Sequence, residues 1–160
     1  MDIMARKTRK TMKTYKENLP EITLKYKSGE QKKVKISKSK DSFDIMRLFF
    51  DQDTLELTES VIALFLNRSN NTIGWLKVSQ GGLNGTIVDI RLILATALKC
   101  AASGMILAHN HPSGNKQPSD NDIKITTKLK DAGNIMDIRL LDHLIITETE
   151  YFSMADEVLI

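Results

Sequence analysis

Cysteine is nearly absent from this 160-residue sequence, which contains only one. A single thiol cannot form an internal disulfide bond, and Cys100 lies within an apolar helical pattern. We therefore expect a buried, unreactive thiol and a reducing, cytoplasmic compartment. The same count excludes a nucleobase deaminase, because the zinc site of that class needs a P-C-x-x-C motif as well as H-x-E.

Long apolar runs are also missing. No stretch approaches the roughly 20 apolar residues that cross a bilayer, and no apolar segment follows the positive charges near the N-terminus. The pattern predicts neither a membrane span nor a secretory signal, so we expect no membrane partner. Hydrophobic residues make up 41% of the chain and charged residues 27%, proportions that suit one globular domain with its own core.

Acidic residues are scarce at the start of the chain. Residues 1–40 hold 13 Lys and Arg against 4 Asp and Glu, whereas residues 41–160 hold 10 against 16. The basic excess over residues 1–20 comes from Arg6, Lys7, Arg9, Lys10, Lys13 and Lys16. Two interpretations stay open: a flexible, solvated tail, or a segment that makes weak phosphate contacts with nucleic acid. Aromatic residues are too few among these charges to predict a base-stacking platform.

Apolar periodicity predicts a mixed α/β fold. Residues 21–39 alternate apolar and polar side chains on both sides of a Ser-Gly-Glu turn, which predicts a β-hairpin. Residues 40–160 alternate strand and helix patterns, which favours a mixed β-sheet with helices packed on its faces. The expected strands are 61–66, 73–78, 105–109 and 138–146, and the expected helices are 43–50, 89–103, 119–133 and 151–160.

The most informative segment joins the end of one predicted strand to the start of the next helix. His109 and His111, two of the chain's three histidines, follow the apolar run 105–108. Side chains at positions i and i+2 of an extended segment point to the same side, so both imidazoles can reach one ion. Asp122 comes from the first turn of the predicted helix. Two histidines and one carboxylate, with water in a fourth position, are typical of an open catalytic zinc site.

Three polar residues have both a structural and a functional interpretation. Ser119 and Asp122 fit the S-x-x-D form of a helix-capping box, so both could serve only to start a helix. Glu59 begins the apolar strand pattern and is the candidate base for a hydrolytic centre, which must deprotonate its water. Glu59 could equally be a solvated residue at the start of a strand. Spacing alone leaves both questions open.

The combined pattern resembles the RadC-like branch of the JAB/MPN family, whose JAMM motif is Glu…His-x-His-Pro…Ser-x-x-Asp. The resemblance is carried by the segment LAHNHPSG at residues 107–114, by Pro118-Ser119 ahead of Asp122, and by Leu141-Asp142-His143 with Tyr151 and Ser153. It covers residues 40–160. It implies the JAB/MPN architecture, which is similar to that of cytidine deaminases.

The resemblance also implies a function for each motif residue. His109, His111 and Asp122 would bind Zn²⁺, and Glu59 would be the general base on a metal-activated water. Ser119 would donate a hydrogen bond to the oxyanion that forms when an amide or isopeptide-like bond is attacked. The expected protein is therefore a zinc-dependent hydrolase, similar to a metallopeptidase, with a peptide or protein substrate of unknown identity.

The alternative is a nucleic-acid-binding accessory protein, associated with DNA repair, whose metal site is structural or vacant. The basic residues 1–20 and the DNA-repair label of the RadC family support it. Multi-metal phosphoesterases that begin with H-x-H are excluded, because they need several further histidines and only His143 remains. Asp142 and His143 are neighbours on a predicted strand and so face opposite ways. We expect them to pack or to support a ligand, and not to bind the metal.

Overall fold

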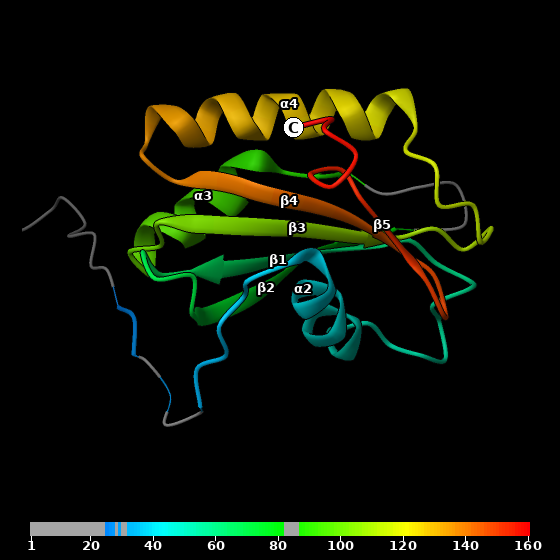
Figure 1. The fold of residues 1–160 in the computed structure, drawn as a ribbon, viewed down its shortest axis with the longest axis horizontal. Coiled ribbons are helices and arrows are strands. Elements are labelled where there is room, and N and C mark those ends of the chain that lie inside the picture. The colour runs from blue at the N-terminus through cyan, green and yellow to red at the C-terminus, as the bar shows by residue number, and fades with distance from the viewer. Residues whose placement is uncertain (1–24, 28, 30–31, 82–86) are drawn as a thin grey trace, which may run out of the picture.

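The computed structural model describes residues 25–27, 29, 32–81 and 87–160. In chain order its elements are α2 (Ser39–Met46), the single 3-10 turn η1 (Arg47–Phe49), β1 (Ser60–Leu66), β2 (Thr72–Gln80), α3 (Ile90–Lys99), β3 (Gly104–Asn110), α4 (Asp120–Ile135), β4 (Arg139–Ile146) and β5 (Tyr151–Ser153). The strands form one sheet in the order β2-β1-β3-β4-β5, which confirms the predicted α/β fold (Figure 1). Among the described residues, no helix combines the length and apolar character that spanning a membrane requires.

β1 and β3 are the central strands that lead to the site. β1 pairs antiparallel with both β2 and β3, while β3 and β4 are parallel and are connected through α4. Every residue of β1 and β3 is buried, which explains their nearly continuous apolar sequence. β5 pairs antiparallel with β4 and ends the sheet on that side.

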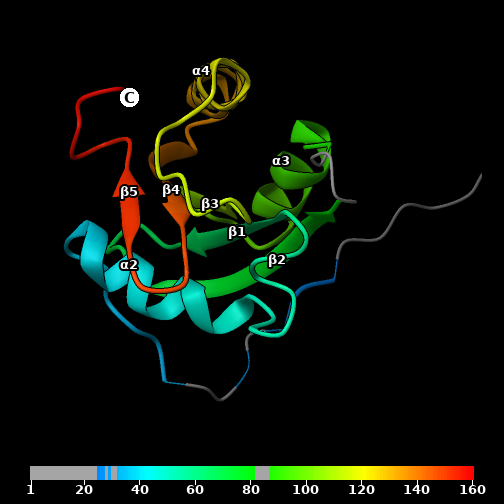
Figure 2. The same ribbon diagram turned by 90° about the vertical axis from the view of Figure 1, so that its right-hand side faces the viewer.

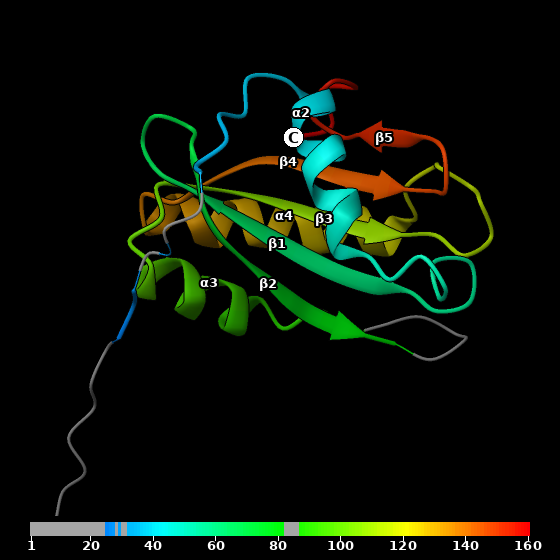
Figure 3. The ribbon, with the colours of Figure 1, turned by 90° about the horizontal axis from the view of Figure 1, so that it is seen from below.

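Helices cover both faces of the sheet. α3 and α4 lie on one face and α2 lies on the other, as the end-on view and the view from below show (Figures 2 and 3). In β3, Leu107 packs in the core under α3 and α4, whereas Ala108 packs in the core against α2. This alternation continues to the end of the strand. It turns His109 towards α4 and Asn110 towards the opposite face.

One extra residue interrupts the pairing of β3 with β4. Met105 lies opposite Leu140, but the next residue of β3 lies opposite Asp142, which leaves Leu141 as a bulge. A one-residue shift moves every later side chain to the other face of a sheet. The bulge therefore decides that His143, and not Asp142, faces α4.

α4 ends where it comes close to the start of β4. A Cβ atom on Gly133 would collide with the carbonyl oxygen of Ile138 and with the side chain of Met105. The carbonyl oxygen of Gly133 also accepts a hydrogen bond from the N–H of Ile138 (2.9 Å). Only glycine allows this approach, so Gly133 lets α4 pack directly on the sheet.

The N-terminal part differs from its prediction. The tail 1–20 and part of the expected hairpin 21–39 lie outside the described residues. The described part of the hairpin segment contains no strand, and Lys35 instead forms an isolated bridge with Asn71. The segment thus pairs with the turn between β1 and β2, so the second strand of the expected hairpin is not formed there.

The prediction of a helix over residues 151–160 is wrong. Residues 151–153 form the short strand β5, and turns follow it. The ring of Tyr151 stacks on that of Phe43 in α2, with 4.6 Å between the ring centroids. The hydroxyl of Ser153 donates to the buried carboxylate of Asp142 (2.7 Å). These contacts and the pairing with β4 outweigh the helical spacing of the apolar residues.

Candidate metal centre

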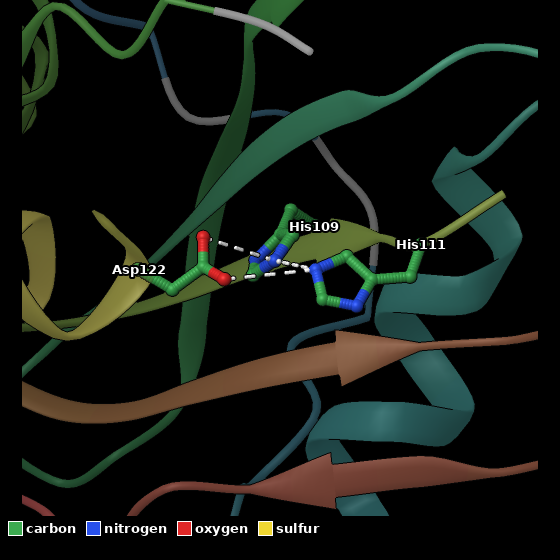
Figure 4. A group of neighbouring side chains, drawn as sticks. All are labelled: His109, His111 and Asp122. Carbon is green, nitrogen blue, oxygen red and sulfur yellow. Dashed lines mark hydrogen bonds and ion pairs between the residues drawn. The ribbon is translucent and has the colours of Figure 1, made fainter. Parts of the chain in front are cut away.

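Three side chains from neighbouring elements converge on one point. His109 is the penultimate residue of β3, His111 directly follows that strand, and Asp122 lies in the first turn of α4. Figure 4 shows the three side chains pointing toward one another. His109 and Asp122 are buried and His111 is half-buried. His111 is therefore the most solvent-accessible member of this cluster.

The donor atoms lie within 4.8 Å of one another when each residue offers one atom. Nε2 of His109 lies 2.9 Å from Nε2 of His111 and 3.4 Å from Oδ1 of Asp122. Nε2 of His111 lies 3.6 Å from Oδ2 of Asp122. A zinc ion bound at about 2.1 Å in tetrahedral geometry separates its ligand atoms by about 3.4 Å. The three residues could thus hold one metal ion, and their donor chemistry suits zinc.

The start of α4 orients the carboxylate of Asp122. The hydroxyl of Ser119 accepts a hydrogen bond from the Asp122 N–H (3.2 Å) and donates one to its Oδ2 (2.6 Å). The N–H of Ser119 also donates to Oδ2 (2.8 Å). The predicted capping box is present, and it leaves Oδ1 directed at His109. Asp122 can therefore start the helix and face the cluster at the same time.

Charge couples the members of the cluster. Burial opposes ionisation of Asp122, but hydrogen bonds with His109 and His111 outweigh it and hold the pKa of the carboxyl well below its usual range. The hydrogen bond with Asp122 in turn raises the pKa of His111, against a smaller opposing effect of burial. Each of the two groups thus favours the charged form of the other, and a divalent cation would compete with a proton for His111 on binding.

Glu59 lines the same small hollow as two members of the cluster. It immediately precedes β1, is half-buried, and lines the hollow together with His109 and Asp122. The other lining residues come from β1, β3 and β4, from the segment just before α3 and from the first two turns of α4, and they are Val61, Val88, Leu107, Asn121, Ile125 and His143. The Glu59 carboxylate adds to the larger effect of Asp122 in raising the pKa of His111. The fold thus brings the sequence-predicted base next to the sequence-predicted ligands.

Asn110 is a site residue whose role no sequence pattern predicts. Its Nδ2 donates to the carbonyl oxygens of Leu55 (2.6 Å) and Thr58 (2.9 Å), and its Oδ1 accepts from the N–H of Ser60 (2.7 Å). These bonds fix the backbone on both sides of Glu59. One signal in the sequence could have indicated its orientation. Asn110 lies between His109 and His111, so the alternation of a strand turns its side chain to the face of the sheet opposite theirs.

His143 contacts the cluster from behind. Its Nε2 lies 2.8 Å from Nδ1 of His109, and its Nδ1 lies 2.5 Å from Oγ1 of Thr126 in α4. Burial lowers the pKa of His143 well below its ordinary value. Asp142 faces away and accepts a hydrogen bond from Ser153, and burial raises the pKa of this carboxyl. The prediction that only one of the two neighbours approaches the site is confirmed.

The fold and the cluster together define a class of protein. A mixed five-stranded sheet with helices on both faces carries two histidines at the end of a central strand and an aspartate at the start of the next helix. This is a JAB/MPN-type domain with a candidate metal centre. The family model described as the RadC-like JAB domain matches residues 36–159, and the chain belongs to this family.

The chain is similar to bacterial proteins called UPF0758. It is 51% identical over 124 residues to the UPF0758 protein of Flavobacterium johnsoniae, which covers 77% of this chain and 52% of that protein. The UPF0758 protein of Aquifex aeolicus is 37% identical over 139 residues, with 87% and 58% covered. That of Clostridium perfringens is 39% identical over 137 residues, with 86% and 59% covered. The chain therefore spans a little over half the length of these relatives.

Proposed function

We propose that this domain is a zinc-dependent hydrolase that cleaves amide or isopeptide bonds. The observation that supports it most directly is the convergence of His109, His111 and Asp122 beside a hollow that Glu59 lines together with His109 and Asp122. Membership of the RadC-like JAB family fits the same chemistry. Zn²⁺, when bound by these three residues, would act as a Lewis acid and lower the pKa of a water ligand to about 7.

Glu59 is the general base in this proposal. Its carboxylate accepts a proton from the attacking water and then gives it to the nitrogen of the leaving amine, so the proton count balances over the reaction. Apolar neighbours in the hollow, including Val61 and Ile125, limit the bulk water that competes for this proton.

Ser119 assists at the carbonyl oxygen of the substrate. Its side chain is exposed at the N-cap of α4. Its hydroxyl donates a hydrogen bond to Oδ2 of Asp122. Rotation about the C–O bond would let the same hydroxyl donate to the oxyanion instead, as negative charge develops there. The backbone N–H of Ser119 still holds the carboxylate of Asp122 during this rotation.

Zinc content tests the proposed ligands. After zinc-replete purification we expect about one zinc ion per chain, and its loss in His109→Ala and in Asp122→Ala. Asp120→Ala is the matched control, because Asp120 is an exposed carboxylate in the same first turn of α4. A parent protein that holds no zinc would overturn the proposal.

Hydrolysis tests the proposed base. Glu59→Gln keeps the size of the side chain but cannot accept the proton, so it should retain zinc and lose about 10²- to 10⁴-fold in rate. The assay uses a panel of fluorogenic peptides and of lysine side chains acylated with peptides. Glu56→Gln, which changes an exposed carboxylate in the same loop, should leave the rate unchanged. Full activity of Glu59→Gln on a cleaved substrate would exclude Glu59 as the base.

No observation in the described residues favours the nucleic-acid alternative, because its basic segment, residues 1–20, lies outside them. Binding of duplex and single-stranded DNA can be measured across salt concentrations, with and without that segment. Tight binding that disappears with residues 1–20, in a protein that takes up no zinc, would favour the accessory role.

A further inference from the structure

We propose that His143 and Thr126 are positioning residues that hold His109 in the form protonated at Nδ1, so that the lone pair of its Nε2 faces the metal position. This inference rests on the metal binding in the proposed function. It concerns two buried side chains that the proposed hydrolysis does not use. Neither residue touches the substrate or the metal in this proposal.

The inference is based on an unbroken series of short contacts behind the cluster. Nδ1 of His109 lies 2.8 Å from Nε2 of His143, whose Nδ1 lies 2.5 Å from Oγ1 of Thr126. Oγ1 of Thr126 lies 2.5 Å from the backbone carbonyl oxygen of Asp122. His109, His143 and Thr126 are each at most 2% exposed, so water does not offer them alternative partners.

The last acceptor in this series fixes the direction of every hydrogen bond. A carbonyl oxygen cannot donate, so the contact between Thr126 and the Asp122 carbonyl requires the one hydroxyl proton of Thr126. Oγ1 of Thr126 must then accept from Nδ1–H of His143. A neutral ring has one N–H, so Nε2 of His143 is then unprotonated and accepts a hydrogen bond from Nδ1–H of His109.

The opposite direction would prevent metal binding. Suppose that Thr126 donated to His143. Oγ1 of Thr126 and the carbonyl oxygen of Asp122 would then lie 2.5 Å apart with no proton between them, and this contact would be repulsive. His143 would then donate to His109 and leave the proton of that ring on Nε2. Because Nε2 of His109 is the atom that faces His111 and Asp122, that tautomer would present a proton to the metal.

The series also connects the three elements that form the site. His109 is in β3, His143 in β4 and Thr126 in α4, one turn after Asp122. The ring of the first ligand is thereby oriented by the same helix that supplies the third ligand. Residues that hydrogen-bond to metal-binding histidines typically change metal affinity by about 10- to 100-fold when they are replaced.

Three threonine variants separate this role from a packing role. Thr126→Val keeps the shape but removes the hydroxyl, and we expect zinc affinity, measured by chelator competition, to fall about 10- to 100-fold. Thr126→Ser restores the hydroxyl and should recover most of that affinity. Thr127→Val is the matched control, because Thr127 makes the same kind of bond to the backbone four residues earlier but is exposed.

Nitrogen NMR of the histidine rings reads the tautomer directly. The chain has only three histidines, so a ¹⁵N-histidine-labelled full chain gives few ring signals, which His143→Gln and His111→Gln assign. In the parent we expect His109 and His143 to be protonated at Nδ1, both with zinc and without it. In Thr126→Val we expect the His109 proton to move partly to Nε2.

Two results would overturn the inference. One is a parent protein in which metal-free His109 carries its proton on Nε2, a measurement that needs no variant. The other is a folded Thr126→Val protein with the zinc affinity and the ring signals of the parent. A parent that fails to bind zinc would overturn the proposed function instead, and the metal-free spectrum would still decide the direction of the hydrogen bonds.

Discussion

Replacement of Asn110 tests how the backbone beside Glu59 is held. Asn110→Ala removes three hydrogen bonds, to the carbonyl oxygens of Leu55 and Thr58 and from the N–H of Ser60. A net value of about 1 kcal/mol for each gives a loss of about 3 kcal/mol in the free energy of unfolding. For a domain of this size that corresponds to a fall of about 6–12 °C in Tm.

The assay separates stability from catalysis. Thermal unfolding of the metal-free protein, followed by circular dichroism, measures the loss in Tm without the added effect of zinc. The bonds of the Asn110 side chain hold neither histidine nor Asp122, so Asn110→Ala should still bind zinc. Hydrolysis should fall, because Glu59 is no longer held next to the cluster. Asn134→Ala, at an exposed position near the end of α4, is the control and should change neither quantity.

A negative charge introduced at position 110 gives a second, independent check. Asn110→Asp keeps an acceptor for Ser60 but places a carboxylate oxygen against the carbonyl oxygens of Leu55 and Thr58. It should be at least as destabilising as Asn110→Ala near neutral pH, and it should recover in part at acid pH, where the carboxyl is protonated. An Asn110→Ala protein with the Tm and the hydrolysis rate of the parent would refute the reasoning.

Three further predictions concern metal, pH and packing. Zinc at 100 times its Kd should stabilise the parent by about 2.7 kcal/mol and so raise its Tm by about 5–11 °C. Asp122→Ala should show no rise in Tm, and a similar rise in this variant would mean that zinc binds elsewhere. Because the pKa of His111 is raised, its contribution to metal-free stability is complete below about pH 6.5 and is lost as pH rises through the raised pKa. Denaturant unfolding with a chelator present should show this decline, and Asp122→Asn should remove it. Gly133→Ala should cost about 1–3 kcal/mol, since its Cβ would collide with the carbonyl oxygen of Ile138; an unchanged urea midpoint would contradict this.

Local patterns in the sequence were sufficient to predict the positions of the candidate ligands. The strand period of two residues puts His109 and His111 on one face, and the capping pattern places Asp122 in the first turn of a helix. Both are properties of a few neighbouring residues, and in the structure the two histidines lie together with Asp122, although β3 ends one residue before His111. The central strands were predictable for the same reason, because strands that are buried on both faces consist almost entirely of apolar residues.

Features that depend on distant parts of the chain were not predictable. The acceptors of Asn110 are backbone carbonyl groups in another loop, which no side-chain pattern reports. The segment 151–160 has apolar residues at helical spacing, yet the pairing with β4 makes a strand of its first three residues. The opposite orientation of Asp142 and His143 was predictable, but which of them faces the site depends on a bulge in the pairing of β3 with β4.

The bulge at Leu141 sets the total charge of the candidate centre. Without it, Asp142 would occupy the place of His143 behind His109. A divalent ion would then face two carboxylates, one as ligand and one behind the histidine, and the assembly would be electrically neutral. With the bulge, the only carboxylate among the three candidate ligands is Asp122, so the ion, its ligands and the residue behind His109 together carry one more positive charge than they would without it. That charge attracts an electron-rich carbonyl oxygen, so strand register contributes to the electrophilic character of the site.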